Sequence, residues 1–205
     1  MEETMFKQTS FYVALLALVL SWPVNAQQVN RVGTPMPPEF NWSLDEPITR
    51  DQITADISKL QPGEIPTTAA LTSVVTWVSN TVGLPANYNL PTIERVSHMK
   101  LAAIFHGSQF VSPGRRLGVY DDDRRAILLP SEWTGSKPED LSILIHEMVH
   151  HLQNVAGLQF QCAQEREKLA YIAQEKWLAP SRRSLEMSFG IDPETFLFNN
   201  ECYIP

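Results

Sequence analysis

Three of the chain's five histidines lie in the stretch HEMVHH, residues 146–151. His146 and His150 are four residues apart, and Glu147 directly follows the first of them. In a helix, residues four apart lie about 40° from each other, so both histidines share one face. Two imidazoles on one face can each direct a ring nitrogen at one metal ion about 2.0–2.1 Å away. Glu147 lies about 100° from His146, where it can reach a water on the metal more easily than the metal itself.

The residues around the histidines have the pattern of an amphipathic helix. Ser136 and Glu139 match the capping box S-x-x-E at its start, and Gly157 is a natural C-terminal stop. The side opposite the histidines carries Leu144, Ile145, Met148, Val149, Leu152 and Val155. The sequence therefore predicts a helix with an apolar back for the core and a front that presents the histidines.

The pattern H-E-x-x-H, here HEMVH, resembles the zinc-binding helix of the zincin superfamily of metallopeptidases. The resemblance covers about residues 115–178. It implies one zinc ion per chain, bound by His146 and His150, and hydrolysis of peptide bonds by a metal-activated water with Glu147 as general base. In zincins an edge strand beside this helix binds the substrate backbone, and AILLP, residues 126–130, would hold that place.

A catalytic zinc site needs a third protein ligand and an open fourth position. The metzincin subclass would require glycine at 153 and histidine at 156, and this chain has Gln153 and Ala156, so that subclass is excluded. The gluzincin-type resemblance implies instead a glutamate from the following helix, residues 162–179. If the two helices are antiparallel, Glu165 and Glu167 flank the level of the second histidine.

Glu167 is the preferred third ligand, and Glu165 is the alternative. Glu167 shares an arc with two small residues, Ala163 and Ala170, which would let the helices approach closely. Its context, EKLAY, resembles the E-x-x-A pattern around the glutamate ligand of gluzincin-like families. Tyr171 is one turn further on and is a candidate donor to the oxyanion, although a tyrosine at a helix edge more often packs with a wetted hydroxyl.

Two other functions remain open at this point. One is an exported, zinc-binding but catalytically inactive structural or interaction module, in which a fourth protein ligand such as His151 closes the metal site. Otherwise His151 lies between the two faces of the helix, and we expect it to support the ligands or pack at the core edge. The other is an exported binding protein without metal.

The rest of the chain predicts a compact α+β fold of the zincin type. A small mixed sheet or hairpin would pack on the histidine helix and on the glutamate-bearing helix after it. The hairpin is indicated by two β-rich pieces, LGVY and AILL, on either side of the polar DDDRR. The other expected elements are helices within 49–60, 67–84 and 97–107 and a strand at 91–96.

The N-terminal residues resemble a targeting segment. FYVALLALVL, residues 11–20, is too short to span a bilayer, which takes about 20 residues. Lys7 precedes it, and the small residues Val24 and Ala26 follow, as in a secretory signal peptide cleaved after residue 26. An N-terminal membrane anchor is the alternative. We expect a signal peptide at 1–26, a proline-rich arm at 27–50 and a single domain at 51–205.

The composition limits the possible partners and compartments. With 205 residues and 43% hydrophobic residues the chain can bury one good core, and its net charge of −7 without basic clusters argues against nucleic acid. We expect a periplasmic or secreted protein that acts on peptide or protein and is not inserted in a membrane after cleavage. In an oxidising compartment Cys162 and Cys202, the only cysteines, would form a disulfide.

Overall fold

A computed structural model describes residues 48–106 and 118–192 of the chain. The predicted signal peptide, residues 27–47 of the arm and Cys202 lie outside these residues, so the bridge between Cys162 and Cys202 stays a prediction. All the described residues belong to one unit, residues 39–205. None of the described helices is long and apolar enough to cross a membrane.

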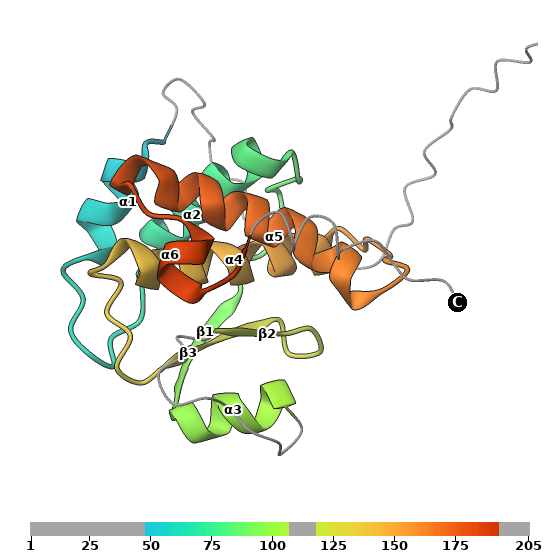
Figure 1. The fold of residues 1–205 in the computed structure, drawn as a ribbon, viewed down its shortest axis with the longest axis horizontal. Helices are drawn as coiled ribbons and strands as arrows, with labels where there is room; N and C mark the ends of the chain where they lie inside the picture. Colours follow the sequence, from blue (N-terminus) through green and yellow to red (C-terminus); the bar gives the residue numbers. More distant parts are fainter. Residues whose placement is uncertain (1–47, 107–117, 193–205) are drawn as a thin grey trace, which may run out of the picture. The chain divides into compact units, whose positions relative to one another are not determined.

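The described residues form an α+β fold with a small three-stranded sheet, which confirms the predicted fold class at this level (Figure 1). The elements in chain order are α1 (Arg50–Ile57), α2 (Thr68–Val82), β1 (Thr92–Val96), α3 (His98–His106), β2 (Val119–Asp121), β3 (Ala126–Pro130), α4 (Pro138–Val155), α5 (Ala163–Leu178), the 3-10 helix η1 (Ala179–Ser181) and α6 (Leu185–Phe189). The predicted helices, strand and hairpin therefore all form within a few residues of their expected bounds.

The sheet has the strand order β1-β3-β2. β1 runs parallel to β3 with Thr92 opposite Ala126, and β2 is antiparallel to β3 with Tyr120 opposite Ile127. The prediction that AILLP is an edge strand is wrong, because β1 occupies the second side of β3. Within the described part of the chain, β2 is an edge strand of the sheet that contacts α4.

β3 is buried along its whole length because helices cover both faces of the sheet. Ile127 and Leu129 belong to the main core, to which α4 contributes its apolar side. Leu128 faces the other way and packs with Leu101 of α3. Figure 1 shows α3 on the side of the sheet away from α4. The sheet thus packs against the histidine helix, α4, and supports it.

α4 begins later than the sequence predicts. Its first residue is Pro138, and the N-cap is Lys137, which makes no side-chain capping bond. Ser136 lies one position too early to cap the helix, and its Oγ hydrogen-bonds to Thr134 Oγ1 at 2.7 Å. The predicted capping box is therefore wrong. Proline suits this start because the first helical N–H would have no partner within the helix anyway.

The end of α4 confirms the role of Gly157. Gly157 has a φ of +70°, a conformation that costs glycine little. The amide of Leu158 donates to the carbonyl of Gln153 at 3.0 Å, and the amide of Gly157 donates to that of Asn154 at 2.9 Å. These two bonds form a Schellman motif, which ends the helix and turns the chain towards α5.

The predicted amphipathic character of α4 is confirmed by its packing. The helix contacts α2, α5, β2 and β3. Its buried apolar residues are Leu141, Ile143, Leu144, Ile145, Met148, Val149 and Leu152. Ala170 and Ala173 of α5 are also fully buried, and their small side chains let the two helices lie close together. Burial of the apolar back fixes the rotation of α4 and thereby directs the histidines towards α5.

Candidate metal centre

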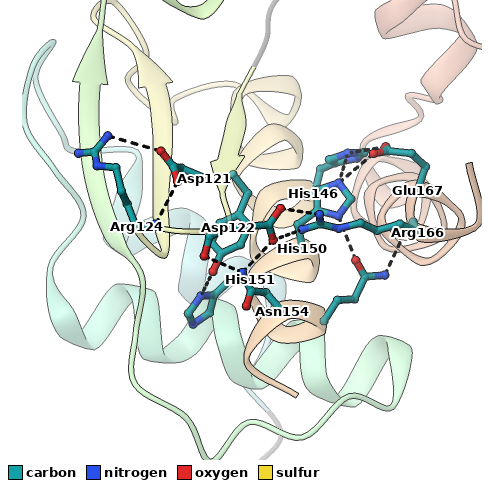
Figure 2. A network of polar contacts seen from close by, with 11 residues as sticks. Asp121, Asp122, Arg124, His146, His150, His151, Asn154, Arg166 and Glu167 are labelled. Atoms are coloured by element: carbon teal, nitrogen blue, oxygen red, sulfur yellow. Dashed lines mark hydrogen bonds and ion pairs between the residues drawn. The ribbon is translucent and has the colours of Figure 1, made fainter. Parts of the chain in front are cut away.

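His146 and His150 of α4 face Glu167 of α5 (Figure 2). The two Nε2 atoms are 3.1 Å apart. His146 Nε2 lies 3.1 Å from Glu167 Oε2, and His150 Nε2 lies 3.2 Å from Glu167 Oε1. A tetrahedral ion with bonds of about 2.0–2.1 Å separates its ligand atoms by about 3.3 Å. The three side chains are therefore spaced as ligands of one small ion, and within the described residues they form a group that could hold one.

Glu165, the alternative third ligand, points elsewhere. It is exposed, and its Oε2 accepts a hydrogen bond of 2.6 Å from the backbone amide of Gln161, which lies just before α5. Of the two glutamates, only Glu167 reaches the histidines. The antiparallel arrangement of α4 and α5 accounts for this, since Gln153 Nε2 donates to the carbonyl of Arg166 across the helix pair.

The cluster concentrates charge in a partly buried place. Burial by itself would raise the pKa of Glu167, but hydrogen bonds from His146 and His150, whose Nε2 atoms carry a proton in the imidazolium form, hold it far below its ordinary value. Burial would lower the pKa of His146, yet Glu167 and the nearby Glu147 raise it overall. The carboxylate of Glu167 is thus kept ionised and attracts positive charge, as a proton or as a metal ion, between the imidazoles.

Glu147 lies beside the cluster and is only 6% exposed. Burial raises its pKa, against the opposing effect of His146 and His150, and the backbone N–H of Tyr120 in β2 donates to its carboxylate. A carboxylate with a raised pKa, next to a possible metal, is suited to take up and release a proton.

His151 is held away from the cluster. Burial raises the pKa of Tyr120 to about 12, so its hydroxyl stays protonated and donates to His151 Nδ1 over 3.1 Å. His151 Nε2 then donates to the carbonyl of Asn89 at 2.8 Å. Both ring nitrogens are occupied, so His151 is not a fourth metal ligand. It supports the site by tying β2 to α4.

Tyr171 of α5 lies against one of the candidate ligands. Its ring meets that of His146 edge to face, with centroids 4.7 Å apart and an interplanar angle of 72°. The ring therefore helps to fix the orientation of His146. The donor role expected for its hydroxyl stays a prediction.

The family model described as a domain of unknown function (DUF6647) matches residues 64–202. The chain belongs to the DUF6647 family. Searches of curated proteins and of solved structures match nothing. The match to the DUF6647 model starts before α2 and contains all three candidate ligands and Glu147.

An ion pair that sequence reasoning missed fastens the hairpin of the DUF6647 domain to the helices (Figure 2). Both terminal nitrogens of Arg166 lie 2.7 Å from the carboxylate of Asp122, and Asn154 Nδ2 donates to the same carboxylate at 2.8 Å. Burial would raise the pKa of Asp122, but the bonds from Arg166 and Asn154 lower it overall. Arg166 precedes Glu167, so one turn of α5 binds both the hairpin and the histidines.

Gly118, also missed from the sequence, lets the backbone before β2 approach Glu147. A β-carbon there would lie 2.7 Å from Ile143 Cγ2 and 2.9 Å from Glu147 Cγ. In Gly118→Ala we therefore expect Glu147 to be displaced. If the site has the hydrolytic activity that the zincin resemblance implies, turnover should fall by about tenfold or more while the metal content stays unchanged. Metal analysis and rate measurements on the same preparation test this. Full activity in Gly118→Ala would show that Glu147 needs no such close support.

Proposed function

We propose that the protein is a zinc-dependent metallopeptidase of the zincin type that hydrolyses peptide bonds with Glu147 as general base. The observation that carries the proposal is the convergence of His146, His150 and Glu167 at ligand spacing, with a buried carboxylate beside them. HEMVH lies on a helix, as the zincin resemblance requires.

The donor set favours zinc among the common metals. Two imidazole nitrogens and one carboxylate are the protein ligands of a well-known class of catalytic zinc sites, whereas magnesium and calcium prefer oxygen ligands. In the described residues no fourth His, Cys, Asp or Glu joins the group, as an open coordination position requires. A bound zinc ion would lower the pKa of a coordinated water towards 7 and polarise a carbonyl group.

The chain's own residues supply the remaining steps. The Glu147 carboxylate takes a proton from the attacking water and passes it to the nitrogen of the leaving amine. Tyr171, whose ring packs against that of His146, would donate from its phenol to the oxyanion. The substrate backbone lies along β2, which takes the place that the zincin resemblance first gave to β3.

The proposed substrates are peptides or proteins outside the cytoplasm. This part rests on the signal-like residues 1–26, which predict a periplasmic or secreted protein. The net charge of −7 and the absence of basic clusters in the sequence speak against nucleic-acid substrates.

Metal removal tests the proposal. The purified protein should contain close to one zinc per chain and cleave a quenched fluorescent peptide library. A chelator should abolish cleavage, and stoichiometric zinc should restore it. No zinc uptake, even after incubation with the metal, would contradict the whole proposal. Zinc binding without cleavage of any peptide would favour the inactive module instead.

A further inference from the structure

Two buried glutamines, one for each histidine, support the candidate ligands. Gln153 of α4 is 0% exposed and Gln174 of α5 is 4% exposed. The Oε1 of Gln153 lies 3.0 Å from His150 Nδ1, and the Oε1 of Gln174 lies 3.1 Å from His146 Nδ1. Each histidine thus contacts an amide with Nδ1, while Nε2 faces the cluster.

The orientation of the first amide follows from its other contact. Gln153 Nε2 is 2.9 Å from the carbonyl oxygen of Arg166, which can only accept a hydrogen bond. The NH₂ group must therefore point to Arg166, and the amide oxygen must point to His150. Because that oxygen is an acceptor, Nδ1 of His150 has to carry the proton.

The second amide is oriented through a serine. The hydroxyl of Ser142 donates to the carbonyl of Glu139 at 2.7 Å, and its oxygen then accepts from Gln174 Nε2 at 3.2 Å. This directs the Gln174 amide oxygen to His146, whose Nδ1 must again be the donor. Two independent chains of hydrogen bonds therefore assign the same tautomer to both ligands.

We propose that Gln153 and Gln174 are positioning residues that hold both histidines in the Nδ1–H tautomer, so that both Nε2 lone pairs are directed at the metal. The inference rests on the metal site of the proposed function and deepens it. When each neutral ring carries its proton on Nδ1, the two Nε2 atoms and the Glu167 oxygens are all hydrogen-bond acceptors. They lie 3.1–3.2 Å apart, which is close to the distance between two ligand atoms of one zinc ion. Such a group is preorganised to bind a cation.

Neutral amides suit this centre better than charged partners. Histidine ligands often donate their second ring N–H to a carboxylate. Here Glu147 and Glu167 already place two carboxyl groups in a partly buried cluster. A third and fourth negative charge would be costly to bury, and an amide oxygen fixes the tautomer without adding charge.

The test is the zinc affinity of variants, measured by competition with a chromophoric chelator. Gln174→Met and Gln153→Met keep the side-chain length but accept no normal hydrogen bond, so we expect zinc to bind about 10–100-fold more weakly. The matched control is Gln159→Met, because Gln159 is exposed in the turn between α4 and α5 and its substitution should leave the affinity unchanged.

The two glutamate variants give a sharper comparison. In Gln174→Glu the new carboxylate still accepts from Nδ1 of His146 and lies beside a hydroxyl, so zinc should bind more tightly than in Gln174→Met, whereas the third buried negative charge should lower the stability of the zinc-free protein. In Gln153→Glu the carboxylate would face the Arg166 carbonyl, which has no proton to give, so the affinity should fall. Simple loss of packing would not separate these two variants.

Long-range ¹H–¹⁵N spectra of the zinc-loaded protein give an independent readout. Both ligands should show a protonated Nδ1, and each Gln→Met variant should alter this signature at its own histidine. Wild-type affinity and unchanged spectra in both Gln→Met variants would overturn the inference and leave the proposed metal site standing. A wild-type protein that binds no zinc would overturn both.

Discussion

Replacement of Glu147 by glutamine should leave zinc in the protein and lower kcat by about 10²–10⁴-fold, the usual contribution of a general base. Glutamine has nearly the same shape, so it can still fill the buried space next to Gly118 and accept the N–H of Tyr120. Its amide cannot take a proton from water. The measurement is kcat together with zinc content on the same preparation.

The matched control for Glu147→Gln is Glu165→Gln, which changes an exposed carboxylate that is not in the cluster. It should keep both zinc and turnover. If Glu147→Gln retained full activity, the proposed base would be wrong. If it lost zinc, Glu147 would act as a ligand.

Replacement of Glu167 by alanine should remove zinc from the protein and abolish cleavage. Glu167 is the described carboxylate that contacts both imidazoles, and its loss leaves two neutral ligands for a divalent ion. Loss of a hydrogen bond that supports a metal ligand weakens metal binding about 10–100-fold. We expect loss of the ligand Glu167 itself to weaken zinc binding by more than this. Metal analysis after dialysis and a chelator titration both measure this.

Glu165→Ala is the comparison that decides the third ligand. Glu165 lies two residues away on the same helix and bonds the amide of Gln161 instead. Glu165→Ala should therefore bind zinc like the wild type. Loss of zinc in Glu165→Ala but not in Glu167→Ala would reverse the assignment.

The parts of the site that the sequence predicts well are those set by local spacing. The four-residue interval between His146 and His150 and the apolar back of α4 needed no knowledge of the fold. The hairpin and the turn at Gly157 followed from local signals as well. Together they bring Glu165 and Glu167 to the level of His150, and the resemblance to the gluzincin pattern favours Glu167 of the two.

The misassigned strand shows where local reasoning stops. Whether AILLP is a central or an edge strand depends on β1, which pairs with it from another part of the chain. A signal was present, because Ile127, Leu128 and Leu129 form a continuous apolar run and not the alternation of a half-buried strand. Such a run indicates burial on both faces, as the structure shows.

The sequence also contains a signal for Gln153 and Gln174. Gln153 lies seven residues after His146, and Gln174 lies seven residues after Glu167. Seven residues are nearly two helical turns, so each glutamine shares a face with a candidate ligand. Their pairing with particular ring nitrogens could not be predicted, because it depends on the relative position of α4 and α5.

The turn at Gly157 has a consequence for the order of folding and metal uptake. Because of this turn, the three candidate ligands meet although they all lie within the short stretch 146–167. An ion bound to them closes only a small loop, so it would restrict the unfolded chain little. The main core joins the apolar sides of α4 and α5 to α1, α2 and the sheet, and these last elements supply no candidate ligand. In a zinc finger metal binding and folding are one event. Here the apolar core extends well beyond the candidate ligands, so we expect the proposed zinc ion to bind a chain that is already folded.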